Sequence, residues 1–518
     1  MARLLPDPIW PDPIWKRSVI QRGYPVQKIA FILCGLALVA CSGQVNPVET
    51  DQAAATTDVQ VTSLPNETAL ALKTQMENGL TPAVVFEGET VPTYSLDERM
   101  GKHNTPAVSI AYAKDGELVW AQAYGEAVDT ETRFQAASMS KVVAAVGIVT
   151  YALENGISID QDVDALVPGL DLRSISPEGS SITLRGLLSH TAGATVGGFP
   201  GYAMGETVPS NLDVILGGGD TNTDAVVFTD NPDGAFRYSG GGFQIAQAVV
   251  EAQSGQPFET TLADLVLTPI GMSSSTFAPI APGSSSEGIA TATNGDGSAV
   301  EGGWHVYPEQ AAAGLWTTPT EYVDFVFALM ASGQDGAALG IAEAVAGEIL
   351  TPVSEAYGLG IGIEDAEGRI RYRHGGSNRG YRCFFMAFPD TGEVFVMMTN
   401  SANGSALGAE IIRAAAGTYG WPDAEPKIVS RVDLTDAQLS KFAGAYALPG
   451  SDEAYATLSL GDTVLAGTLA TGSDFSLVPL SETRFIDPDD GQEITFQDAD
   501  GVVSLSAGGT TLSRLASE

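Results

Sequence analysis

Ser138 and Lys141 lie three residues apart in the stretch "QAASMSKVVAAVG". On a helix this spacing places the hydroxyl and the amine on one face. The surrounding Ala, Val and Met side chains desolvate the ammonium and lower its pKa, so the amine can take a proton from the serine at neutral pH. A serine at a helix N-terminus also lies near backbone N–H groups that can hold an oxyanion. The pair therefore predicts nucleophilic attack on a carbonyl carbon.

The Ser-x-x-Lys spacing is weak by itself, because it occurs about once by chance in a chain of this size. The alternative for Lys141 is a surface lysine that lays its apolar stem along the protein. Four later stretches favour the catalytic interpretation: "ITLRGLLSHTAG" from 182, "FRYSGGGFQIAQAVVE" from 236, "AAAGLWTTPTEYVDF" from 311 and "HGGSNRGY" from 374. In this order, after "FQAASMSK", they resemble the β-lactamase-related serine hydrolases over roughly residues 94–421. That group includes class C β-lactamases, D-alanyl-D-alanine carboxypeptidases, D-aminopeptidases and related esterases.

The resemblance implies a role for three side chains. Ser138 is the expected nucleophile and Lys141 its proton partner. Tyr238 falls at the family's tyrosine position, where its phenolic oxygen would act as base toward the serine and as acid toward the leaving group; this needs a phenolate stabilised by the lysine. The alternative for Tyr238 is a packed aromatic residue.

The "HGG" stretch is the expected substrate-binding strand. His374, Gly375 and Gly376 would line a strand beside the cleft, and the glycines would let substrate lie against the backbone. The backbone N–H groups of Ser138 and Ser377 would form the oxyanion hole.

Two departures from the family pattern narrow the expected activity. The family's Tyr-x-Asn is Tyr-Ser-Gly at 238–240, so the amide that would bind a substrate acylamide is missing. The Lys-Thr-Gly of typical β-lactamases is His-Gly-Gly at 374–376, which replaces a permanent cation by a titratable imidazole. Both changes favour an esterase or D-peptidase over a dedicated β-lactamase.

Other polar and aromatic residues have structural explanations. His190 is a candidate Ser-His partner, but in the family its motif shapes a loop under the site. Trp316 and Tyr381 either line the pocket or pack in the core. Cys383, in the apolar "RCFFMAF", is expected to be a small core residue and not a nucleophile. The four dispersed histidines form no metal-ligand cluster in the sequence, and neither a metal nor an organic cofactor is expected.

The composition describes an acidic globular protein. Of its residues 44% are hydrophobic and 17% charged, and 63 acidic against 25 basic residues give a formal charge of −38. Such a field repels phosphate backbones, so a nucleic-acid partner is not expected.

The N-terminus has the pattern of a lipoprotein signal. Basic residues precede the apolar run "IAFILCGLALVA", which is short for a bilayer span and ends at Cys41. The stretch "LVAC" resembles the lipobox of bacterial lipoproteins. We therefore expect a signal peptide over 1–40, lipidation of Cys41, a tether over 41–65, and anchoring at the outer membrane facing the periplasm. The alternatives are a plain cleaved signal and an uncleaved anchor.

The remaining chain divides into two expected domains. Residues 66–425 read as α+β: a hairpin with Asp115-Gly116 at its turn, apolar helices starting near 138, 240 and 319, strands over 357–400 and a helix near 404–417. The resemblance implies a β-lactamase/transpeptidase-like fold, an antiparallel sheet flanked by helices with a helical subdomain. Residues 434–518 alternate in short runs and predict a small antiparallel barrel or sandwich.

The expected function is hydrolysis of an ester or amide, including D-amino-acid peptides and β-lactams, through a Ser138 acyl-enzyme. The competing hypothesis is a penicillin-binding-like sensor or scaffold that is acylated by cell-wall peptides without efficient turnover. The expected substrate is a small molecule or peptide, and the sequence does not identify a protein partner for the C-terminal domain.

Overall fold

The computed structural model describes residues 66–515 apart from 126, 232–233, 332–339, 355, 471–473, 500–501 and 508–509. The predicted signal peptide, the tether and Cys41 lie outside the described residues.

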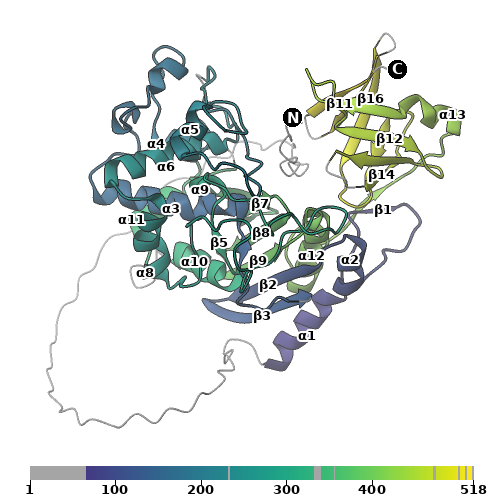
Figure 1. Ribbon diagram of the computed structural model, residues 1–518. Coiled ribbons are helices and arrows are strands. Elements are labelled where there is room, and N and C mark those ends of the chain that lie inside the picture. The colour runs from purple at the N-terminus through teal and green to yellow at the C-terminus, as the bar shows by residue number, and fades with distance from the viewer. Residues whose placement is uncertain are drawn as a thin grey trace, which may run out of the picture. The chain divides into compact units, whose positions relative to one another are not determined.

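A six-stranded antiparallel sheet forms the centre of the larger domain, in the order β3-β2-β9-β8-β7-β6 (Figure 1). Its strands are β2 (Ala107–Lys114), β3 (Glu117–Gly125), β6 (Gly362–Ala366), β7 (Arg369–Asn378), β8 (Tyr381–Phe388) and β9 (Glu393–Thr399). Asp115 and Gly116, at the turn between β2 and β3, have φ of 54° and 83°, as a two-residue hairpin turn requires. The predicted antiparallel sheet is confirmed, although its strands after the helical subdomain begin at Gly362 and not at 357.

Helices cover both faces of this sheet because its strands are apolar on both sides. Val394 and Val396 of β9 pack in one apolar cluster with the helix α10, whereas Phe395 and Met397 pack in another with α1 and α12. These helices are α1 (Asn66–Glu77), α10 (Pro319–Ala331) and α12 (Gly404–Tyr419). The alternation follows from the two-residue period of a strand.

A helical subdomain lies between β3 and β6 in the sequence. Its elements are β4 (Phe134–Gln135), η1 (Ala137–Met139), α3 (Ser140–Glu154), η2 (Asp164–Leu166), η3 (Leu172–Ile175), α4 (Leu184–Leu188), α5 (Asn211–Leu216), α6 (Gly240–Ser254), α7 (Phe258–Leu262), η4 (Ala263–Leu267), α8 (Thr268–Ile270), α9 (Gln310–Ala313), β5 (Trp316–Thr317) and α11 (Glu343–Ile349). The stretch Ala137–Glu154 is long and apolar enough to cross a membrane, but 72% of it is buried inside the protein. This burial identifies α3 as a core helix.

Three helix ends have clear caps. Gly156, just after α3, has a φ of 68°, and Gly255 closes α6 in the left-handed conformation. At the start of α10, the Thr318 hydroxyl accepts a hydrogen bond from the Glu321 N–H at 3.2 Å and caps the helix.

The C-terminal domain is a closed eight-stranded antiparallel barrel and not a sandwich, because β18 pairs back onto β11 through Tyr446 and Arg514. Its strands are β11 (Gly444–Ala447), β12 (Ala456–Leu460), β13 (Leu465–Leu469), β14 (Asp474–Pro479), β15 (Arg484–Ile486), β16 (Glu493–Ala499), β17 (Val502–Ala507) and β18 (Thr510–Arg514), preceded by α13 (Asp436–Leu439) and η6 (Ser440–Phe442). Aromatic rings such as Phe442, Phe485 and Phe496 fill its core.

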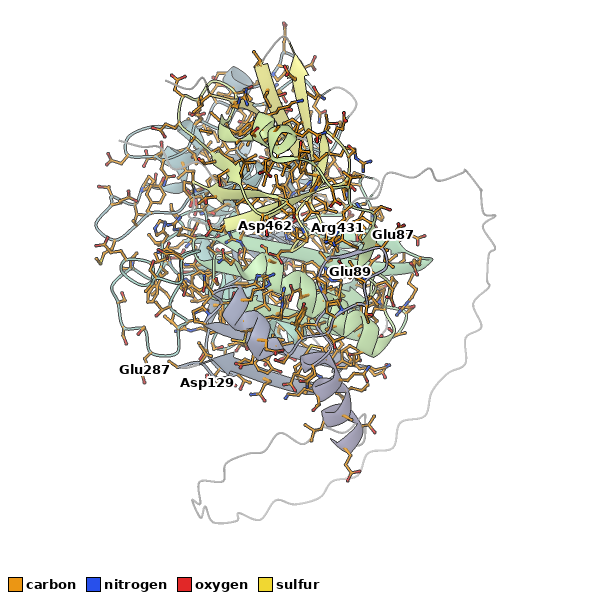
Figure 2. The ribbon with its side chains drawn as sticks, turned by 90° about the vertical axis from the view of Figure 1, so that its right-hand side faces the viewer. Glu87, Glu89, Asp129, Glu287, Arg431 and Asp462 are labelled. Carbon is orange, nitrogen blue, oxygen red and sulfur yellow. The ribbon has the colours of Figure 1, made fainter. Side chains whose placement is uncertain are left out.

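A short parallel pairing precedes the barrel. Strand β10 (Lys427–Val429) pairs with β1 (Val84–Phe86), which lies just before α2 (Leu96–Lys102). Next to this pairing, Arg431 forms an ion pair with Glu89 at 3.4 Å (Figure 2).

Candidate active site

Ser138 lies on the tight turn between β4 and α3. The preceding Ala137 has a φ of 48°, a left-handed conformation that L-residues rarely adopt. Such local strain often marks functional turns. The serine is in the 3-10 helix η1 directly before α3, and its side chain is partly exposed, so a substrate can reach it.

Lys141 is a buried cation with no acidic partner. Its side chain is 2% exposed, and its Nζ donates to Ser138 Oγ at 3.1 Å and to the Ala312 carbonyl oxygen at 2.8 Å. Among the described residues, no carboxylate forms an ion pair with it. Burial therefore lowers the pKa of Lys141 to about 7. At neutral pH a large fraction of the amine is neutral and can accept a proton from the adjacent hydroxyl.

Tyr238 closes the other side of this pair. Its ring centroid lies 5.1 Å from Lys141 Nζ. Burial raises the pKa of Tyr238 by more than the nearby Ser138 hydroxyl lowers it, so the phenol is protonated at neutral pH. The structure thus brings the three predicted side chains together but reverses one expectation. The environment does not stabilise a phenolate base, and the low pKa of the lysine makes its amine the better base.

His190 packs against the Tyr238 ring. Its ring lies 4.3 Å from that of Tyr238 at 40°, and its Nδ1 accepts the Ser239 N–H at 3.1 Å. The Ser239 hydroxyl in turn caps α6 by accepting the Gly242 N–H at 3.0 Å. An accepting Nδ1 means that His190 is neutral with its proton on Nε2. Burial and the nearby Lys141 both lower its pKa. His190 thus contacts the site through Tyr238, and its motif shapes this loop as expected.

His374 is in the site, but both of its nitrogens are already engaged. Its Nδ1 lies 2.6 Å from the Gly375 carbonyl oxygen, and its Nε2 lies 3.0 Å from the Tyr357 hydroxyl. Because a carbonyl oxygen only accepts, Nδ1 carries the proton and Nε2 accepts from Tyr357. Burial, followed by the charge of Lys141, lowers the pKa of His374 to about 3. The predicted titratable imidazole is therefore neutral throughout the physiological pH range.

The part of strand β7 after His374 lies close to the turn that carries Ser138. A Cβ at Gly376 would lie 2.3 Å from the Ala136 carbonyl oxygen, so only glycine permits this approach. Strand β6 pairs with β7 only over Arg369–Arg373, which leaves 374–378 without a β6 partner. The backbone N–H groups expected for the oxyanion hole, those of Ser138 and Ser377, lie on these two adjoining segments.

Asn378 fixes the end of strand β7 through two hydrogen bonds of its side chain. Its side-chain amide donates to Gln135 Oε1 at 2.7 Å and to the Ala313 carbonyl oxygen at 3.1 Å. Cys383, on the neighbouring strand, is 2% exposed, and Trp316 and Tyr381 pack edge to face in the core at 5.9 Å. These three residues are core residues.

The position of the family's asparagine is filled by an aromatic ring. A Cβ at Gly240 would lie 2.6 Å from the Phe199 ring and 3.3 Å from the Gly197 carbonyl oxygen. Gly240 has no amide side chain, and the ring of Phe199, which is 9% exposed, occupies the space beside it. The sequence analysis missed both Phe199 and Tyr357, because neither lies at a spacing that links it to its partner.

No group of three or more His, Cys, Asp or Glu side chains that could hold a metal ion occurs in the described part of the chain. The chemistry of this site is that of a hydroxyl, an amine and a phenol held together, which suits acyl transfer.

Comparison with known proteins gives a consistent family and fold. Residues 95–419, more than half of the chain, match the beta-lactamase family model. Penicillin-binding protein 4 of Amycolatopsis lactamdurans is 24% identical over 381 residues, which cover 65% of this chain and 94% of that protein. The octameric penicillin-binding protein homologue from Pyrococcus abyssi aligns with a TM-score of 0.53 at 20% identity, over 81% of this chain and 98% of its own. The D-amino acid amidase from Ochrobactrum anthropi SV3 aligns with a TM-score of 0.50 at 17% identity, over 62% and 96%. At these identities the two structures show the fold alone.

Proposed function

The chain belongs to the beta-lactamase family, and from this we propose that it hydrolyses an ester or amide through an acyl-enzyme on Ser138. The observation that carries the proposal is the 3.1 Å contact between Ser138 Oγ and a buried amine that forms no ion pair with any described carboxylate. Its low pKa supplies a base where the nucleophile needs one.

The reaction follows from the geometry in two half-reactions. Neutral Lys141 takes the proton of Ser138 as its Oγ attacks the carbonyl carbon. The N–H groups of Ser138 and Ser377 hold the resulting oxyanion. Tyr238, which is protonated, passes its proton to the departing oxygen or nitrogen and regains one from protonated Lys141, so an alcohol or amine leaves and Lys141 is neutral again. Water then gives a proton to Lys141 as it adds to the acyl carbon, and the Ser138 oxygen leaves with the proton that Tyr238 donates, which Lys141 returns to Tyr238. The products are the carboxylic acid and free serine.

The test is covalent labelling of the folded protein. Fluorophosphonate is expected to add one label at Ser138, and p-nitrophenyl esters should be turned over. Ser138→Ala should lose both, whereas Ser459→Ala, a serine replacement on the barrel surface, should keep both. An intact-mass spectrum with no adduct at position 138 would overturn the proposal.

The second candidate is a penicillin-binding-like sensor that is acylated without efficient turnover. The missing asparagine at position 240 favours slow deacylation. A stoichiometric burst of p-nitrophenol without steady turnover would support the sensor, and continued turnover would support the hydrolase.

We also propose a lipid anchor on Cys41 that holds the protein at the outer membrane, facing the periplasm. The support is the order of basic residues, apolar run and cysteine before residue 42. Mass spectrometry of the mature N-terminus should find a diacylated cysteine at position 41, and Cys41→Ala should abolish the modification. An unmodified N-terminus would contradict the anchor.

A further inference from the structure

The groups around Ser138 leave little to attract an anionic substrate. We propose that this site hydrolyses uncharged esters or carboxamides that carry an apolar group beside the scissile carbonyl, and that it rejects substrates with a free carboxylate. The inference rests on the proposed hydrolase function and names the substrate class of the same site.

Lys141, His374 and His190 cannot serve as a fixed cation for a carboxylate. His190 is neutral, because its Nδ1 accepts the Ser239 N–H. Lys141 directs its Nζ to Ser138 and to the Ala312 carbonyl oxygen. His374 is neutral, with Nδ1 donating to Gly375 and Nε2 accepting from Tyr357. His374 therefore offers a carboxylate no unengaged N–H donor, and Lys141 already directs two of its donors to Ser138 and to the Ala312 carbonyl oxygen.

The arginines on the neighbouring segments are held by other groups. Arg237 donates to Thr229, Arg373 pairs with Glu364, Arg379 donates to Asn294 at 2.7 Å, and Arg382 donates to the Asn378 and Tyr381 carbonyl oxygens. Each of these arginines thus already has a partner, and a guanidinium held by one such bond keeps its other N–H donors.

Two aromatic side chains, Phe199 and Phe236, lie beside the site, and Phe199 takes the space where the family has an asparagine amide. Phe199 occupies the space next to Gly240, so no amide projects there. Phe236 is 47% exposed, and its ring lies 5.2 Å from Tyr357 and 5.6 Å from His190. An exposed aromatic ring beside a catalytic group offers a surface for an apolar substituent to pack on.

The energetics follow from desolvation. A carboxylate that loses water without gaining a cation or hydrogen-bond donors costs several kcal/mol, whereas an apolar group gains from the same burial. The formal charge of −38 adds a repulsive field for anions, which salt screens. Salt does not screen the desolvation cost inside the site, so assays at high salt separate this cost from the long-range repulsion of anions.

The experiment compares matched neutral and anionic esters on the wild-type protein. One pair differs on the acyl side, methyl p-nitrophenyl suberate against mono-p-nitrophenyl suberate, whose carboxylate is too far along the chain to attack its own ester. The other differs on the leaving group: methyl 4-acetoxybenzoate against 4-acetoxybenzoate. Each kcat/KM is divided by the rate constant for hydroxide, and the assays contain about 0.5 M NaCl to screen the surface field.

We expect the neutral ester to be preferred at least about tenfold in both pairs. A smaller ratio in either pair, or no hydrolysis of the neutral esters, overturns the inference. Labelling of Ser138 by fluorophosphonate separates the two claims, because a labelled serine with no preference refutes only the substrate class. In Arg379→Gln the ratios should stay within about twofold; a large rise in either ratio would show that this arginine receives the carboxylate, which also overturns the inference.

Discussion

Two buried cations, Arg99 and Lys141, lie on opposite sides of the central sheet and are treated differently. Arg99 is 6% exposed, and its Nε donates to Glu410 Oε2 at 2.6 Å; His103 lies 3.1 Å from the same carboxylate. Burial alone would lower the pKa of Arg99, but the bond to Glu410 outweighs it and raises the pKa. Lys141 is equally buried without a carboxylate, and its pKa falls to about 7.

The difference separates a charge used for structure from one used for chemistry. A paired buried cation stays charged and ties α2 to α12, whereas an unpaired one gives up its proton near neutral pH. Replacing Lys141 should therefore lower activity and stabilise the fold. Removing the carboxylate that pairs with Arg99 should destabilise the fold and leave activity nearly unchanged.

The largest effect is expected from Lys141→Met. It removes the base, so kcat/KM for a neutral ester should fall about 10²- to 10⁴-fold. The same change should stabilise the fold by about 2–4 kcal/mol at pH 6, since each unit of pKa shift is worth about 1.4 kcal/mol. Because the folded pKa lies below that of free lysine, this gain is full below about pH 7 and disappears as the pH rises toward the ordinary lysine value. Denaturant unfolding at pH 6 and pH 9 measures it, and a destabilised Lys141→Met would contradict the comparison.

Glu410→Gln should do the reverse. It leaves buried Arg99 with only one described counter-ion, the more distant Asp489 at 3.9 Å, and the free energy of unfolding should fall by about 3 kcal/mol. The catalytic side chains lie on the other face of the sheet, so kcat/KM of the folded enzyme should stay within about twofold. Urea unfolding and esterase assays on the same preparation test both statements; a large loss of activity in the folded enzyme would refute the separation.

Gly240→Asn tests whether Phe199 fills the space beside position 240. The new side chain would meet the Phe199 ring, and the variant should lose about 1–3 kcal/mol of stability through overpacking. Adding Phe199→Ala should recover part of that loss and raise the relative kcat/KM for N-acetylaminoacyl esters over simple acyl esters. If the double variant is no more stable than Gly240→Asn alone, Phe199 is not the obstacle.

The smallest effect is expected at an exposed pair. Asp390 accepts from Arg369 Nε at 2.8 Å, but its side chain is 46% exposed. Asp390→Asn should change the unfolding free energy by less than about 1 kcal/mol and leave activity unchanged. A loss as large as that of Glu410→Gln would show that burial is not what distinguishes the two pairs.

The sequence predicts much of this arrangement because much of it is local. The three-residue spacing of Ser138 and Lys141, the Asp-Gly turn at 115–116 and the apolar α3 each follow from neighbouring residues. The apolar neighbours of Lys141 also predict the direction of its pKa shift. The closed barrel is consistent with the short alternating runs, although they do not distinguish it from a sandwich.

The remainder depends on contacts between distant segments. Tyr357 engages His374 across 17 positions, and Phe199 fills the space at Gly240 from a loop, so no spacing rule indicates either contact. The predicted phenolate at Tyr238 fails for a related reason. Burial, which the sequence motif does not express, raises the pKa of the phenol.

The most direct measurement is the pH dependence of Ser138 acylation by a fluorophosphonate, which has no ionisable group of its own in this range. If neutral Lys141 is the base, the second-order rate constant should rise about tenfold per pH unit below pH 7 and level off above a midpoint near 7. A rate constant that keeps rising to pH 10, or that does not change between pH 5 and 9, would contradict the account.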